Sequence, residues 1–159
     1  MLKWLWLSGL VVVLDQASKW FMSSWLSLYE TVAVMPYFNL TMAHNTGAAF
    51  SFLAQASGWQ RWFFVVLTAV ITTALVVWLK RLHSSAKLEA IAISMVLGGA
   101  IGNVADRLYH GYVIDFLDVY YGTYHWPAFN IADSAIVVGA VLLILDSFIS
   151  KPSNKQDKK

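Results

Sequence analysis

The sequence predicts an α-helical integral membrane protein with four transmembrane helices and a small β-sheet outside the membrane. Of the 159 residues, 58% are hydrophobic and only 13% are charged, and the mean hydropathy is +0.59. These values set the chain apart from ordinary soluble domains. Four apolar stretches are also long enough to cross a bilayer, which takes about 20 residues. They cover about residues 4–26, 62–79, 88–108 and 128–149, and they predict a single membrane domain over residues 1–150.

The first apolar stretch resembles a secretory signal peptide because Lys3 precedes it. The apolar run continues past Asp15 to Trp25, however, and it contains no clear small-x-small cleavage site. We therefore expect this segment to be retained as the first transmembrane helix.

The positive charges predict the orientation of the bundle. Lys80, Arg81 and Lys87 lie between the second and third stretches, whereas residues 26–60 contain no Lys or Arg. Because cytoplasmic loops are enriched in Lys and Arg, we expect both termini to be cytoplasmic and the loops after the first and third stretches to face outward. Residues 151–159 include four lysines and no apolar cluster, which predicts a solvated cytoplasmic tail.

The two outward-facing segments are not simple linkers. In the segment that covers about residues 30–52, apolar side chains alternate with other residues on either side of Pro36. This two-residue period is typical of β-strands. The outer loop 109–127 is rich in aromatic and β-branched residues. Together these segments predict an outer, β-rich cap.

The sequence gives no sign of a metal or cofactor site. It has no cysteine, which excludes disulfides, thiolate metal sites and a cysteine nucleophile. His44, His110 and His125 are neither close together nor part of an HExxH motif. No phosphate-binding glycine loop or nucleic-acid-binding surface is recognisable either. We expect no metal, no organic cofactor and no nucleic-acid partner.

Asp15 and Lys19 lie inside the first apolar stretch, four residues apart. Burying a charge in a membrane costs about 3 kcal/mol on insertion scales, so such residues usually have partners or a function. The spacing places both on one helical face, where they can form an ion pair. A structural role and a direct chemical role both remain open at this point.

The third stretch ends in a cluster of small and polar residues. Gly98 and Gly102 are four apart, which allows close approach of another helix. Asn103 and Arg107 share a helical face and can point together at a carbonyl or carboxylate group. Close helix packing with a polar helix end is the alternative interpretation.

Asp133 lies near the start of the fourth stretch, about four residues inside it and roughly 6 Å deep. Asp115 and Asp118 lie in the preceding loop, close enough in the chain for one of them to meet Asp133. Two adjacent carboxyl groups at a low-dielectric boundary do not both ionise readily. Such a pair can activate water and protonate an amide carbonyl, as in aspartic proteases. A helix cap is the alternative role of Asp133.

Four quoted segments resemble the bacterial lipoprotein signal peptidase family, also called signal peptidase II, over nearly the whole chain. They are "DQASKW" at 15–20, "NTGAAFSF" at 45–52, "GGAIGNVADRLYHGYVIDFLDVY" at 98–120 and "FNIADSAI" at 129–136. The resemblance implies an intramembrane aspartyl endopeptidase that removes the signal peptide from prolipoproteins just before a diacylglyceryl-modified cysteine. It also implies four membrane helices, an extracytoplasmic β-cradle and a short outer helix in the bacterial inner membrane, with the active site near the outer face.

The same resemblance assigns roles to individual residues. Asp115 and Asp133 match the catalytic aspartates of the family. Five residues match positions that line the site or bind substrate: Asn45, Gly47, Asn103, Arg107 and Asn130. Asp15, Lys19 and Asp106 match supporting positions, with Asp106 expected to pair with Arg107. The implied partners are diacylglyceryl-modified prolipoproteins, membrane lipids and inhibitory peptide antibiotics of the globomycin type.

Two other classes of protein also accommodate acids inside membrane helices. A small proton-coupled transporter needs such acids for transport, although no internal repeat of the kind common in transporters is detectable. A purely structural bundle that binds partners through its glycine-rich face is the second alternative.

Overall fold

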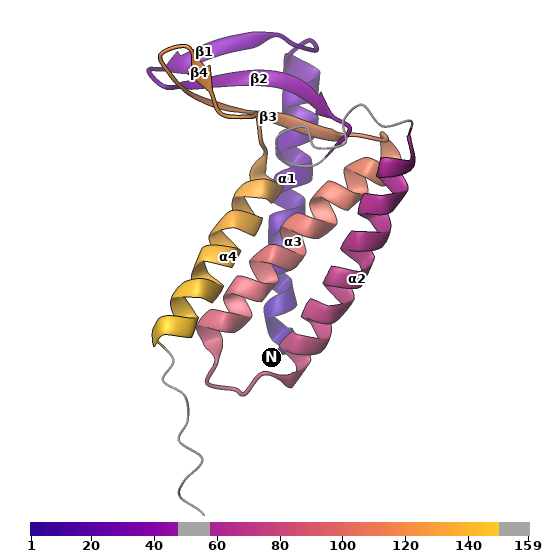
Figure 1. The fold of residues 1–159 in the computed structure, drawn as a ribbon, viewed down its shortest axis with the longest axis vertical. Coiled ribbons are helices and arrows are strands. Elements are labelled where there is room, and N and C mark those ends of the chain that lie inside the picture. Colours follow the sequence, from indigo (N-terminus) through magenta and orange to yellow (C-terminus); the bar gives the residue numbers. More distant parts are fainter. Residues whose placement is uncertain (48–57, 150–159) are drawn as a thin grey trace, which may run out of the picture.

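The computed structural model describes residues 1–47 and 58–149, in which four long helices run side by side and a small sheet lies across one end of them (Figure 1). A short 3₁₀ helix, η1 (Leu2–Trp4), leads into α1. The helices are α1 (Leu5–Trp25), α2 (Trp59–Arg81), α3 (Lys87–Tyr109) and α4 (Ile131–Ile149). The strands are β1 (Thr31–Met35), β2 (Phe38–Asn45), β3 (Val113–Tyr121) and β4 (Tyr124–His125).

Three helices within the described residues, α2, α3 and α4, are long and apolar enough to cross a membrane. Helix α1 has 21 residues but is not among them. Its apolar run is interrupted by Asp15, Gln16 and Lys19, and two of these, Asp15 and Lys19, are buried against the bundle. The predicted total of four spanning helices is therefore not confirmed.

Helix α4 begins at Ile131, three residues later than the apolar pattern suggests. The reason is that Phe129 pairs with Leu117 of β3: its backbone N–H donates to the Leu117 carbonyl at 3.0 Å, and the Leu117 N–H donates back at 2.8 Å. The chain is thus extended up to Asn130. Asp133 consequently lies in the first turn of α4 and not about four residues inside it.

The sheet is antiparallel, with strand order β1-β2-β3-β4, which confirms the expected small sheet. Strand β2 pairs with β3, for example Ala43 with Asp115, so segments far apart in the sequence become neighbours. The predicted β-rich segment extends to residue 52, but its part beyond Gly47 lies outside the described residues, as does the tail 151–159. Residues 1–47 and 58–149 include no short helix at the sheet end of the bundle.

Helix α3 contacts all three other long helices, and glycines make its contacts with α1 and α4 close. A Cβ atom on Gly99 would collide with the Ala132 carbonyl oxygen and lie 2.8 Å from Ile136 of α4. A Cβ atom on Gly102 would collide with the Asp15 carboxylate of α1. The close approach predicted from the glycine spacing is therefore present, and it sets the distance between α1, α3 and α4.

We predict that Gly99→Ala lowers the thermal stability of the detergent-solubilised protein, because the added methyl group forces α3 away from α4. A small-to-large change in a packed interface costs about 1–3 kcal/mol. Gly9→Ala is the matched control, since a Cβ atom there has no neighbour within 4 Å and alanine favours a helix over glycine by about 1 kcal/mol. Equal melting temperatures for the two variants would contradict the proposed role of Gly99.

Candidate active site

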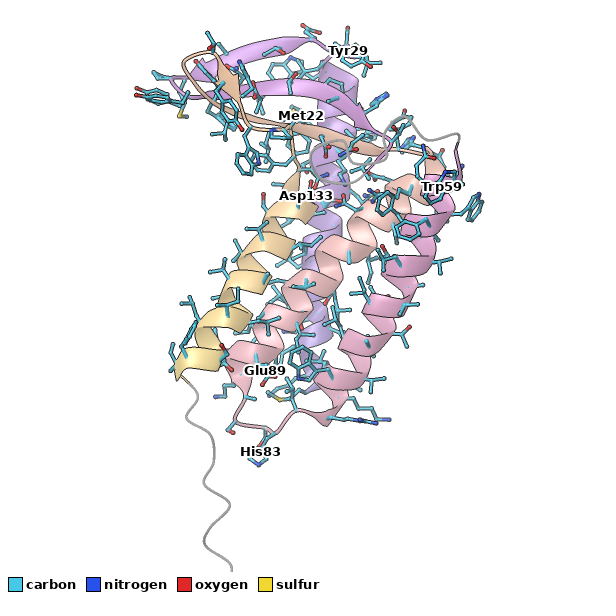
Figure 2. The ribbon with its side chains drawn as sticks, viewed as in Figure 1. Met22, Tyr29, Trp59, His83, Glu89 and Asp133 are labelled. Carbon is cyan, nitrogen blue, oxygen red and sulfur yellow. The ribbon has the colours of Figure 1, made fainter. Side chains whose placement is uncertain are left out.

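A cavity of about 810 Å³ lies where the sheet meets the ends of α3 and α4. Figure 2 shows Asp133 at this end of α4, below the sheet. The polar side chains that line the cavity come from β2, α3, β3 and α4 and from the residue after β2: His44, Asn45, Thr46, Asn103, Arg107, Asp115, Asp133 and Ser134. The two aspartates singled out in the sequence thus reach one cavity from different elements.

Asp115 is almost completely buried in β3, with 2% of its surface exposed. Its Oδ1 accepts a hydrogen bond from Asn130 Nδ2 at 2.7 Å, and its Oδ2 accepts one from Asn45 Nδ2 at 3.1 Å. Burial is the main cause that raises the pKa of Asp115 to about 7, and the nearby charge of Asp133 raises it further. The hydrogen bonds from the two asparagines and the charge of Lys19 oppose this rise. The Asp115 carboxyl group therefore gains and loses its proton near neutral pH.

Asp133 and Asn130 cap the N-terminus of α4 reciprocally. The Asp133 N–H donates to Asn130 Oδ1 at 2.9 Å, and the Asn130 N–H donates to Asp133 Oδ2 at 3.3 Å, the arrangement of a capping box. Asp133 Oδ1 also accepts a hydrogen bond from Asn103 Nδ2 at 2.7 Å. The capping role considered for Asp133 is thus real, and it leaves the carboxylate at the cavity wall.

Asn103 and Asn130 connect the two aspartates. Asn130 Nδ2 lies 3.1 Å from Asn103 Oδ1 and also donates to Asp115. Asn103 in turn donates to Asp133. Each carboxylate therefore accepts hydrogen bonds from two N–H donors, which fixes its position and direction.

A buried ionic cluster lies next to these asparagines. Lys19 Nζ is 2.8 Å from Asp15 Oδ2 and 2.9 Å from Asp106 Oδ2, so the predicted pairing of Asp15 with Lys19 is confirmed. The expected pairing of Asp106 with Arg107 is wrong, because Lys19 of α1 reaches Asp106 from the neighbouring helix. Asp15 Oδ1 also accepts the Ala132 N–H at 2.9 Å. The cluster thus joins α1, α3 and the start of α4.

Arg107 holds the segment that follows β2. Its Nη2 donates to the Gly47 carbonyl oxygen at 2.7 Å, and its Nη1 donates to the Asn103 carbonyl oxygen at 3.3 Å. The guanidinium also lies over the ring of Phe64, 4.9 Å from its centroid. The Gly47 N–H donates to Asn45 Oδ1 at 3.0 Å. Arg107 and Asn45 therefore line the cavity, and both hold the backbone of Gly47 beside it.

The structure separates Asp118 from Asp115. Asp118 accepts hydrogen bonds from Asn39 Nδ2 at 2.9 Å and pairs with His125 Nδ1 at 2.9 Å, and it does not line the cavity. The two acids are three residues apart in one strand, so they point to opposite faces. This strand period is a sequence signal that distinguishes them.

Gln16 was not recognised from the sequence. Its Nε2 donates to Asp106 Oδ1 at 2.8 Å and lies 3.2 Å from the Gly102 carbonyl oxygen. Its position next to Asp15 in "DQASKW" is the only signal that points to it. Within residues 1–47 and 58–149, no group of three His, Asp or Glu side chains is arranged to hold a metal ion.

Comparison with known families identifies the chain. The sequence model of Signal peptidase (SPase) II matches residues 7–149, which is most of the protein. The chain belongs to the signal peptidase II family. The resemblance seen in the four sequence segments is thus confirmed.

Relatives and solved structures agree with this membership. The chain is 56% identical to a lipoprotein signal peptidase of Alteromonas mediterranea over 147 residues, which cover 92% of this chain and 81% of the relative. It is 54% identical to that of Pseudomonas aeruginosa strain PAO1 over 97% of this chain and 92% of the relative. A bacterial membrane enzyme solved by the in meso method at 2.3 Å superposes with a TM-score of 0.84 and 32% identity, covering 99% of this chain and 93% of that one. This signal peptidase II family member is a multi-pass membrane protein.

We predict that the stability of the protein falls as the pH rises from about 4 to about 7. The folded-state pKa of Asp115 lies above its ordinary value of 3.8, so the folded protein binds more protons than the unfolded chain in this interval. The contribution is at most about 1.4 kcal/mol per pH unit. Asp115→Asn lacks this titrating group and should show a shallower decline of the melting temperature with pH.

Ser134→Ala is the control, since it removes a cavity side chain that does not titrate. It should keep the slope of the wild-type protein. If Asp115→Asn also kept that slope, Asp115 would not be the group responsible.

Proposed function

We propose that this protein is an intramembrane aspartyl endopeptidase that removes signal peptides from prolipoproteins. It would hydrolyse the amide bond before a diacylglyceryl-modified cysteine, with Asp115 and Asp133 as the catalytic pair. The observation that carries the proposal is that these two carboxylates line one cavity, each held by two N–H donors. Membership in the signal peptidase II family supports the same conclusion.

The pair divides the roles of acid and base. We assign the shared proton to Asp115, whose pKa of about 7 keeps it protonated in slightly acidic to neutral solution. The Asp133 carboxylate takes a proton from water as the water oxygen attacks the scissile carbonyl carbon, and Asp115 protonates the carbonyl oxygen. The tetrahedral intermediate then collapses: the C–N bond breaks, the amine nitrogen takes the proton held by Asp133, and the hydroxyl proton returns to Asp115. Both residues end in their starting states.

The residues that line the cavity suit a substrate that arrives from the lipid. Its lining includes Ile136, Val137 and Val138 of α4. Val137 is 60% exposed and Val138 is 47% exposed on the outside of the bundle. The polar pair is therefore connected to an apolar face on which acyl chains can lie. We propose that Arg107 and Asn45 in the cavity wall, with the adjacent Gly47, hold the peptide part of the substrate, and that peptide antibiotics of the globomycin type occupy the same cavity.

We also propose that all four long helices span the bacterial inner membrane, with the sheet outside and both termini in the cytoplasm. The buried residues of α1 include its two charged groups, while Leu10, Val13 and Leu14 are exposed for contact with lipid. His83, in the loop between α2 and α3, lies at the end opposite the sheet (Figure 2). Lys80, Arg81 and Lys87 flank that loop, as the distribution of positive charge in membrane proteins requires for a cytoplasmic loop.

A proton-coupled transporter is the less favoured alternative. Asp115 and Asp133 lie together at the sheet end of the bundle and not along a path through it. No feature of the described residues specifically favours transport, and the signal peptidase II family is a family of proteases.

We predict that Asp115→Asn and Asp133→Asn each abolish cleavage of a diacylglyceryl-modified prolipoprotein by the purified protein, with losses of at least about 1,000-fold, because each removes a group that transfers protons in the reaction. Gel-based cleavage in detergent and melting temperatures are the measurements. Asp118→Asn is the matched control, since Asp118 is a buried acid of the same strand that does not line the cavity. Cleavage by either catalytic variant near the wild-type rate would refute the assignment.

We further predict that the cleavage rate of the wild-type protein declines as the pH rises above about 7. The reason is that Asp115 loses the proton that it donates to the substrate carbonyl. The measurement is kcat/KM between pH 5 and 9 with stability followed in parallel. A rate that stays constant to pH 9 would show that Asp115 does not act as the acid.

A further inference from the structure

Lys19 is buried in α1 with 2% of its surface exposed, and three oxygen atoms surround its ammonium group. Two are the carboxylate oxygens of Asp15 and Asp106. The third is Oδ1 of Asn103, at 3.0 Å. The two carboxylates already provide the ammonium group with ion pairs. The third contact connects the ionic cluster directly to Asn103, which donates a hydrogen bond to Asp133.

The contact with Lys19 determines which way the Asn103 side chain is oriented. A lysine ammonium group has three N–H donors and no acceptor, so only the oxygen of the Asn103 amide can face it. The amide nitrogen must then point in the other direction, where it donates to Asp133 Oδ1 at 2.7 Å. With the opposite orientation, Asn103 would turn its amide oxygen toward the Asp133 carboxylate, and the oxygen atoms would repel each other.

Asn130 is oriented in a different way. Its Oδ1 accepts the backbone N–H of Asp133 at 2.9 Å, so the capping of α4 fixes its nitrogen toward Asp115. Asn130 Nδ2 also donates to Asn103 Oδ1 at 3.1 Å, so it favours the same orientation of the Asn103 amide as Lys19 does. Without the ammonium group, however, the freed carboxylates of Asp15 and Asp106 would attract the amide nitrogen of Asn103. Lys19 is the charged group that prevents this reversal.

We propose that Lys19 is a positioning residue for the reaction: it holds the amide of Asn103 in the orientation that places and directs the Asp133 carboxylate. This inference rests on the proposed function of the Asp115 and Asp133 pair. It assigns to the ionic cluster of α1 a role in aligning the catalytic base in addition to its role in packing the helices.

The test is a double-mutant cycle of Lys19→Met and Asn103→Leu on cleavage of a diacylglyceryl-modified prolipoprotein. We expect Lys19→Met to lower kcat about 100-fold, the effect of a displacement of about 1 Å in an active site, with little change in KM. Because Lys19 acts through Asn103, the double variant should be no slower than Asn103→Leu alone. Losses that multiply would overturn the inference.

A pH profile gives a second readout that loss of packing would not change. The charge of Lys19 lowers the pKa of Asp115, so Lys19→Met should move the alkaline decline of kcat/KM to higher pH. The variant retains the other charged or titratable groups in the cavity wall and in the adjacent ionic cluster: Asp15, His44, Asp106, Arg107 and Asp133. An unchanged decline would count against the inference.

Ser8→Ala is the matched structural control. Ser8 lies on the same buried face of α1, and its Oγ donates to the Ser94 carbonyl oxygen of α3 at 2.7 Å, so it tests loss of a contact between α1 and α3 away from the site. It should lower stability without changing kcat. If Lys19→Met does not fold, Lys19→Gln replaces it, and wild-type kcat in that variant would overturn the inference.

The outcomes also separate this inference from the proposed function. If Asp115→Asn or Asp133→Asn retains cleavage, the proposed catalytic pair fails, whatever Lys19 does. If both are inactive and the Lys19 and Asn103 effects multiply, the pair stands and only the positioning role of Lys19 fails.

Discussion

The burial of an ammonium group with two carboxylates is the constraint on which the arrangement of this protein depends. Lys19 neutralises one of the charges of Asp15 and Asp106, and backbone N–H donors help to stabilise the remaining one. Breaking such a cluster by removing one member is costly, since it leaves an uncompensated buried charge. The N–H groups of Ala132 and Ile114 belong to α4 and β3, so the cluster holds the first residues of the two elements that carry Asp133 and Asp115.

The small residues of α3 make this cluster possible. A side chain at Gly102 would occupy the place of the Asp15 carboxylate, and a wider separation of the helices would admit lipid or leave polar groups unpaired. The ionic cluster can therefore be buried only if α1 and α3 pack closely. The same closeness brings Asn103 of α3 and Asn130 before α4 within hydrogen-bond distance of each other.

The sequence predicted the helical bundle, the small sheet, the Asp15 and Lys19 pair and the close approach at Gly98 and Gly102, because each depends on local spacing. It did not predict that Asp106 pairs with Lys19, since this contact joins two different helices, α3 and α1. Nor could the apolar pattern show that α4 begins at Ile131, because pairing of Phe129 with β3 decides the boundary. The strand period separates Asp115 from Asp118, but only once that segment is known to be a strand.

The four-residue spacing of Asp15 and Lys19 also bears on how the protein enters the membrane. In the proposed topology, α1 precedes α3 in the chain and meets lipid before α3 has been synthesised. Its two charged side chains lie one helical turn apart and already pair with each other, so α1 can cross the bilayer as a neutral unit. The later arrival of α3 then adds Asp106 and Asn103 to an ion pair that is already formed. The residues that complete the site are thereby added in the order in which the chain is synthesised.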